Sequence, residues 1–223
     1  MFKNFLKLWK GKDFLVKVLD EFKNMLNDAH EMFDSVCRKL VHNEDAAGLK
    51  EKIYGLDQKI NALQKDIRKR IVEHLTLQPS VDVPACLIFM SVVKDAERLG
   101  DYCKNLFEVT QLLDKPIDKE KYQSLFGNVD REISAFFTET RDAFIESDEA
   151  KANHAWNTKG STTKRCDEII EKLAKSDYAI NEAVCFTLVA RYFKRIAAHL
   201  GNIATSVVLP ISDLDYFDEK RDD

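Results

Sequence analysis

Apolar residues recur at intervals of three and four along almost the whole chain, the spacing that places them on one face of an α-helix. The pattern predicts a first helix over residues 13–41 and a second that follows residues 43–45 and ends near Leu75. Pro84, which suits a first helical turn, opens a third predicted helix that ends near Leu113. The first stripe is the most continuous and consists of Leu15, Val18, Phe22, Met25, Ala29, Phe33, Val36 and Leu40.

The second half of the chain has the same organisation. After a linker at residues 114–118, helical patterns follow near residues 120–147, 149–176 and 179–209, and Pro210 closes the last of them. Two amphipathic sets of three helices predict two bundles that lie side by side.

The two halves also resemble each other in sequence. A shift of 97 residues places residues 98–100 (Arg-Leu-Gly) on residues 195–197 (Arg-Ile-Ala), and a shift of 106 places residues 60–61 on residues 166–167. The similarity is faint, but it covers the second and third helices of each half. The predicted fold is therefore all-α, with two pseudo-repeated antiparallel three-helix bundles. The predicted units are residues 13–114 and 119–211.

Composition narrows the class of protein further. Seven glycines and four prolines in 223 residues are too few for the tight turns of a sheet protein. Charged residues make up 32% and the net charge is −4, which argues against a nucleic-acid binder. The five cysteines form no Cys-x-x-Cys pair and lie on apolar stripes, so we expect buried thiols in a reducing cytoplasm. We find no signal peptide and no apolar run that is long enough to span a membrane.

The two ends of the chain differ in character. Residues 1–12 form a short basic amphipathic start, which either touches an anionic membrane surface or folds back onto the bundle. Residues 212–223 are acidic and are expected to be a solvated tail. The last predicted helix is apolar, which hints at an interface and hence at a homo-oligomer.

A row of oxygen-bearing side chains is the main candidate for chemistry. Glu97 and Asp101 are four residues apart on the third predicted helix, and Asp57 and Asn61 are four apart on the second. If these helices pack antiparallel, three carboxylates and one amide face each other, and a hard cation would compensate their charge. The alternative is a solvated helix face on which Arg98 pairs with Asp95.

The residues around this pair carry a family resemblance. Glu97-Arg98-Leu99-Gly100-Asp101, followed by Asn105, resembles the Glu-Arg-Ile-Gly-Asp…Asn signature of the PhoU family of phosphate-uptake regulators. The helix from Asp57 and the turn at Leu77-Gln78-Pro79 resemble the second helix of that family and the turn after it. The chain looks most similar to the PhoU-like branch that is associated with low-affinity (Pit-type) inorganic-phosphate transporters.

The resemblance implies both a cofactor and a role. In the family, acidic pairs on adjacent helices hold metal clusters, so Asp57, Glu97 and Asp101 take ligand positions for iron, zinc, manganese or magnesium. Asn61 stands where the family has Asp, which leaves the site one charge short. The implied role is that of a cytoplasmic accessory protein, which restrains phosphate uptake or signalling through contact with a transporter or a sensor kinase at the inner membrane.

The second repeat departs further from this pattern. The positions that correspond to the four candidate ligands read Thr163, Asp167, Lys194 and Ala198. Lys194 would place an ammonium group where a metal ion would lie, and it can neutralise Asp167 itself. We therefore expect one metal site, in the first repeat. His199 stands where the family commonly has His, and we expect a hydrogen-bonded packing residue there more than a ligand.

Two other classes of function can be compared with this one. A di-iron carboxylate oxidase would need Glu-x-x-His motifs, and no His in the chain has Glu three residues before it. Glycine-rich nucleotide loops are also missing from the sequence, so we do not expect an enzyme. A metal-free helical scaffold that acts only by protein contact remains the alternative.

Overall fold

The computed structural model describes residues 13–44, 47–78 and 82–214. Helices account for nearly all of this part, and it contains no strand. The predictions for residues 1–12, and for most of the acidic tail, concern residues outside it. The elements are the α-helices α2 (Asp13–Leu40), α3 (Leu49–Leu77), α4 (Val83–Leu112), α5 (Lys119–Phe126), α6 (Val129–Glu146), α7 (Glu149–Ala174) and α8 (Ile180–Thr205), followed by the 3-10 turn η1 (Ile211–Asp213).

Five of the six predicted helices are present with similar ends, and the remaining one, the fourth in chain order, is divided. The pattern over residues 120–147 predicted one helix, but the structure has α5 and α6 there. Gly127 ends α5 with a φ of +59°, a left-handed conformation that breaks the helical path. Asp118 begins α5 by accepting hydrogen bonds from the backbone N–H groups of Glu120 and Lys121.

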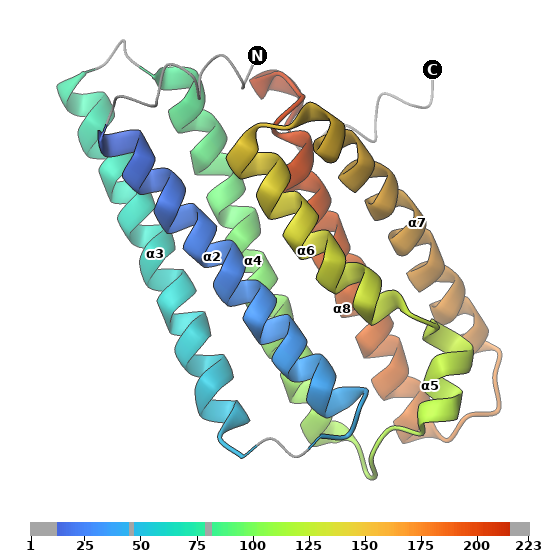
Figure 1. The fold of residues 1–223 in the computed structure, drawn as a ribbon. Helices are drawn as coiled ribbons and strands as arrows, with labels where there is room; N and C mark the ends of the chain where they lie inside the picture. The colour runs from blue at the N-terminus through green and yellow to red at the C-terminus, as the bar shows by residue number, and fades with distance from the viewer. Residues whose placement is uncertain (1–12, 45–46, 79–81, 215–223) are drawn as a thin grey trace.

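The helices form two bundles, as predicted (Figure 1). Helices α2, α3 and α4 pack against one another, and α6, α7 and α8 make the second set. Between the sets, α4 packs along α8 and α2 packs along α6. Helices α3 and α7 therefore lie at opposite outer edges of the molecule. The inner side of each packs against the other helices of its own repeat.

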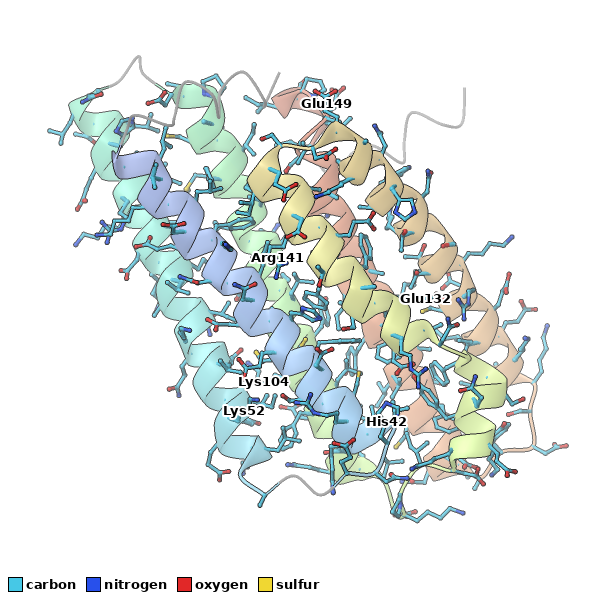
Figure 2. All side chains as sticks on the ribbon, viewed as in Figure 1. His42, Lys52, Lys104, Glu132, Arg141 and Glu149 are labelled. Atoms are coloured by element: carbon cyan, nitrogen blue, oxygen red, sulfur yellow. The ribbon has the colours of Figure 1, made fainter. Side chains whose placement is uncertain are left out.

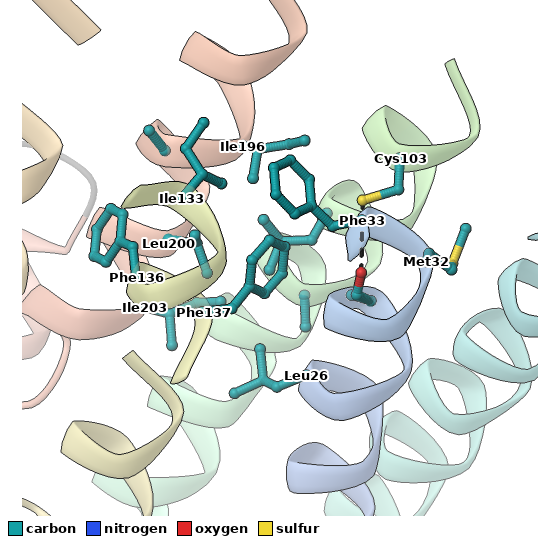
Figure 3. Close-up of a cluster of buried hydrophobic side chains, with 14 of the residues drawn as sticks. Leu26, Met32, Phe33, Cys103, Ile133, Phe136, Phe137, Ile196, Leu200 and Ile203 are labelled. Carbon is teal, nitrogen blue, oxygen red and sulfur yellow. Dashed lines mark hydrogen bonds between the residues drawn. The ribbon is translucent and has the colours of Figure 1, made fainter. Parts of the chain in front are cut away.

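The apolar stripes meet in one continuous core that joins both repeats. The eight residues of the first stripe are all at most 1% exposed, which confirms that prediction. Figure 3 shows Phe33, Phe137, Ile196 and Leu200 packed together where the two repeats meet. Burial of this apolar surface is the main force that holds the repeats together.

Four further expectations can be compared with the structure. All five cysteines are buried free thiols, as expected. Leu87, which we placed on the core stripe of the third helix, is instead 46% exposed. The apolar character of the last helix is explained by burial within the chain, because α8 packs against α4, α6 and α7. None of the helices in the described part has the length of apolar sequence that a bilayer span requires.

Candidate functional site

Helices α3 and α4 approach each other closely. We call the line along which their polar side chains meet, with Asp57 and Asn61 on α3 and Asp101 and Lys104 on α4, the seam of the first repeat. A Cβ atom on Gly100 would lie 3.1 Å from Cδ1 of Ile60 on α3, so a larger residue would press on the neighbouring helix. Glycine costs a helix about 1 kcal/mol relative to alanine. The close approach explains why glycine is tolerated here, and it brings the polar side chains of both helices within hydrogen-bonding distance.

Two of the predicted acidic residues, Asp57 and Asp101, meet on this seam through a shared partner. Asp57 is 9% exposed and faces α4. Nζ of Lys104 lies 3.0 Å from both carboxylate oxygens of Asp57 and 3.4 Å from Oδ1 of Asp101. Nδ2 of Asn61 lies 3.5 Å from Oδ2 of Asp57, at the limit of a hydrogen bond. The ammonium group of Lys104 therefore lies between Asp57 of α3 and Asp101 of α4, whereas Asn61 bonds to Asp57 on its own helix (Figure 2 labels Lys104).

Arg98 contacts both candidate ligand residues of α4, Glu97 and Asp101. Its Nη1 lies 3.0 Å from Oδ2 of Asp101, and its Nε lies 3.8 Å from Oε2 of Glu97. The alternative prediction, an Arg98–Asp95 pair, is wrong because Asp95 points towards the second repeat, where it bonds to His199. Arg98 therefore belongs to the charge network of the seam.

Burial and the neighbouring charges in the seam shift the pKa values of Glu97 and Lys104. Burial, and then the negative charge of Asp101, raise the pKa of Glu97, although Arg98 and Arg68 oppose the shift. Burial alone would lower the pKa of Lys104, but hydrogen bonds and charge from Asp57 and Asp101 outweigh it, so that pKa is raised. The network thus favours a charged Lys104 and disfavours a charged Glu97.

Lys104 was not among the residues predicted for the site. It follows Asp101 by three residues and Glu97 by seven, so all three share one face of α4. That spacing was a usable signal, since a lysine on an acidic row at helical spacing is a ready counter-ion.

The arrangement does not fit a metal ion as it stands. Among the described residues, no group of three or more His, Cys, Asp or Glu side chains is placed to hold one. Lys104 bonds to Asp57 at 3.0 Å and reaches Asp101 at 3.4 Å, so its ammonium group occupies the space that an ion shared by these carboxylates would need. Metal binding at Asp57, Asn61, Glu97 and Asp101 therefore stays a prediction from the family resemblance.

The corresponding seam of the second repeat has a simpler ion pair. Nζ of Lys194 on α8 lies 2.7 and 2.6 Å from the two carboxylate oxygens of Asp167 on α7. The Asp167 side chain is 55% exposed. This pair confirms the expectation that Lys194 neutralises Asp167.

His199 lies between the repeats rather than in either seam. Its Nδ1 is 2.7 Å from Oδ1 of Asp95, and its ring stacks on Tyr102 with 5.6 Å between ring centroids. Tyr102 is the residue that a shift of 97 places on His199, so equivalent positions of the two repeats contact each other. The prediction of a hydrogen-bonded packing residue is confirmed.

The sequence of both repeats matches one known family. The family model, described as the PhoU domain, matches residues 22–110 and 129–207, which together make up most of the chain. The chain belongs to the PhoU domain family. Each match covers one of the two bundles, so the internal repeat is a repeat of PhoU domains.

Comparison with curated sequences and solved structures agrees with this membership. A stretch of 92 residues is 25% identical to the phosphate-specific transport system accessory protein PhoU homolog 1 of Thermotoga maritima, over 41% of this chain and 38% of that protein. The match thus spans well under half of that relative. PhoU from Pseudomonas aeruginosa has a similar fold, with a TM-score of 0.74 and 19% identity over 87% of this chain and 95% of that chain.

A second solved structure has the same fold. The phosphate transport system regulatory protein PhoU from Streptococcus pneumoniae aligns with a TM-score of 0.70 and 17% identity, over 88% of this chain and 95% of that chain. The two alignments include both bundles, so the arrangement of two PhoU domains in this chain is also that of these two proteins.

Proposed function

We propose that this PhoU-domain protein is a regulator of phosphate uptake that works by contact with a phosphate transporter or a sensor kinase at the membrane surface. The observation that carries the proposal is that PhoU domains match both halves of the chain, at residues 22–110 and 129–207. Relatives with this fold are named as accessory and regulatory proteins of phosphate transport. A low-affinity inorganic-phosphate transporter is the partner that the sequence resemblance favours.

The polar groups of the seam support a binding role over a catalytic one. Asp57, Asp101 and Lys104 pair with one another across α3 and α4. A catalytic site needs groups that are positioned around a substrate, whereas these groups already satisfy each other. Action by protein contact requires no such chemistry.

A metal-free scaffold was the alternative function, and one observation favours it over a metal-dependent regulator. Lys104 lies where a cation would compensate the acidic row. A regulator of this kind would transmit its signal through the surfaces of the two bundles, without a bound ion as a structural part. The proposal of phosphate regulation holds in either case.

Phosphate uptake in the native host tests the proposed function. We expect that deletion of the gene raises the initial rate of radiolabelled phosphate uptake, and that expression of the full chain restores it, because the protein restrains uptake. Sulfate uptake serves as the control and is expected not to change. An unchanged phosphate uptake rate, at both high and low external phosphate, would contradict the proposal.

The partner is tested separately. The full chain, with an affinity tag, is expected to co-purify with a phosphate transporter or sensor kinase from detergent-solubilised membranes, and the yield should depend on external phosphate. Recovery of neither protein at either phosphate concentration would argue against regulation by direct contact.

A further inference from the structure

We propose that Lys104 is a built-in counter-ion that takes the place of a metal ion in the first repeat, so that the native seam binds none. The seam keeps carboxylate side chains of the kind that bind metals, and Lys104 bridges two of them, Asp57 and Asp101. This role of Lys104 does not depend on which partner the protein contacts or on whether it regulates phosphate uptake.

The position of the ammonium group is the first argument. Nζ of Lys104 bonds to both oxygens of Asp57 at 3.0 Å and reaches Asp101 at 3.4 Å, so one cation bridges α3 and α4. A metal ion shared by the same two carboxylates would need that space. The Lys104 side chain is 23% exposed, so most of it is covered by the seam.

The charge balance is the second argument. Three carboxylates, those of Asp57, Glu97 and Asp101, lie along the seam. Lys104 and Arg98 contact them directly, and the positive charge of Arg68 acts on Glu97. Three cations thus match three anions. A divalent ion added to this balanced set would meet repulsion from Lys104 and Arg98 at short range.

The second repeat closes its seam by the same chemistry at different positions. Lys194 on α8 holds Asp167 on α7 through both carboxylate oxygens. A shift of 97 places Lys104 on Gly201, and there the stem of Lys159 from α7 would lie 2.7 Å from a Cβ. Each repeat therefore fills its seam with lysine side chains, although the lysines do not occupy equivalent positions.

The structure does not group these side chains around an ion, but we expect that removal of the ammonium group lets the acidic residues of the first repeat close around one. In Lys104→Met the side chain keeps a similar length and loses its charge, which leaves Asp57, Glu97 and Asp101 with an excess of negative charge. The amide oxygen of Asn61 is a further neutral ligand next to Asp57. The second repeat has only Asp167 in its seam, so Lys194→Met is a matched control that removes the same charge without a ligand set.

The experiment measures Mn²⁺ binding to the purified full chain, by the loss of the free-ion signal in electron paramagnetic resonance and by the shift in melting temperature. We expect wild type and Lys194→Met to bind no Mn²⁺ at the seam. We expect Lys104→Met to bind about one ion per chain and to melt at a higher temperature with Mn²⁺ than without it. Both effects should disappear in Lys104→Met/Glu97→Gln/Asp101→Asn.

Two outcomes would overturn the proposal. If wild-type protein binds Mn²⁺, or emerges from metal-supplemented growth with an iron or zinc content that Asp101→Asn abolishes, then Lys104 does not replace a metal. If folded Lys104→Met binds no Mn²⁺, the acidic residues are not a latent site. Should Lys104→Met fail to fold, Lys104→Gln provides the same test, and the wild-type measurement stands without any variant.

Discussion

The two outer seams of the molecule, α3–α4 and α7–α8, have the same architecture and different chemistry. The first holds Asp57 almost out of contact with solvent, in a network with Asp101 and Lys104. The second has one ion pair, Lys194–Asp167, whose carboxylate is mostly exposed. Both pairs of helices nevertheless pack antiparallel in the same type of bundle. The acidic row is therefore not needed for the fold, and its presence in one repeat calls for another reason.

The seams also differ in what packs against their glycines. In the first, the space beside Gly100 is bounded by the end of the Ile60 side chain, 3.1 Å from where a Cβ atom would lie. In the second, the space beside Gly201 is bounded by Cγ of Lys159, at 2.7 Å, close to the backbone of α7. The end of a side chain moves easily, whereas the base of a buried one does not. The space beside Gly201 is thus tighter than the space beside Gly100, and we expect the first seam to depend more on charge.

The largest difference is expected from removal of the carboxylates. Asp57→Ala should lower the free energy of unfolding by about 2 kcal/mol, because a mostly enclosed Lys104 loses its hydrogen-bonded partner. Asp167→Ala should change it by less than about 0.5 kcal/mol, since exposed ion pairs contribute little. Urea unfolding followed by circular dichroism measures both. Equal losses would show that the two seams do not differ in their dependence on charge.

A smaller difference is expected from the glycines. Gly201→Ala should destabilise the protein by about 1 kcal/mol, because the added methyl group collides with the buried stem of Lys159 and outweighs the gain in helix propensity. Gly100→Ala should be within about 0.5 kcal/mol of wild type, because Ile60 can shift and the propensity gain offsets its strain. The measurement is the same urea titration. A greater loss for Gly100→Ala would reverse the steric comparison.

The smallest effect is expected at Glu97. Its pKa is raised by burial and by Asp101, so folding favours the protonated form. The stability that protonated Glu97 adds is fully present at a pH below the pKa of this group in the unfolded chain. It is lost as the pH rises through the higher pKa of Glu97 in the folded protein. Glu97→Gln should therefore raise stability at neutral pH by less than about 1 kcal/mol, since the group is partly screened by solvent.

The pH dependence makes this prediction specific. The gain from Glu97→Gln should fade as the pH is lowered to about 4, where the wild-type carboxyl becomes protonated in both states. Thermal melts at several pH values measure it. The control is Glu168→Gln on the exposed face of α7, which should show no such gain. A gain from Glu97→Gln that grows towards low pH would contradict the sign of the shift.

Much of the fold could be predicted because helical periodicity is a local property. The spacing of Leu15, Phe22 and Phe33 is enough to identify the buried face of the first helix, and all three are fully buried. The break at Gly127 was missed because glycine also occurs inside helices, as at Gly100, and the periodicity of the residues around it continues. Leu87 was misplaced because apolar residues also occur on exposed faces.

The site was predictable in part. Residues four apart on one helix share a face, so Glu97 and Asp101 could be placed together from spacing alone. Which side chain meets them from α3 depends on how the two helices are rotated and shifted against each other. Arg98 had acidic residues within reach at both Asp95 and Asp101, and only the contact with the second repeat shows that Asp95 is already bonded to His199.

The amino-acid sequence by itself determined most of the helices and their buried faces, the repeat and the acidic rows, because each follows from the order of residues along a regular backbone. The tertiary structure alone decided which charged side chains meet across the two helices. Charges act across space at a few ångströms, and the antiparallel packing of α3 on α4 brings Lys104 to Asp57, a residue 47 positions away in the chain.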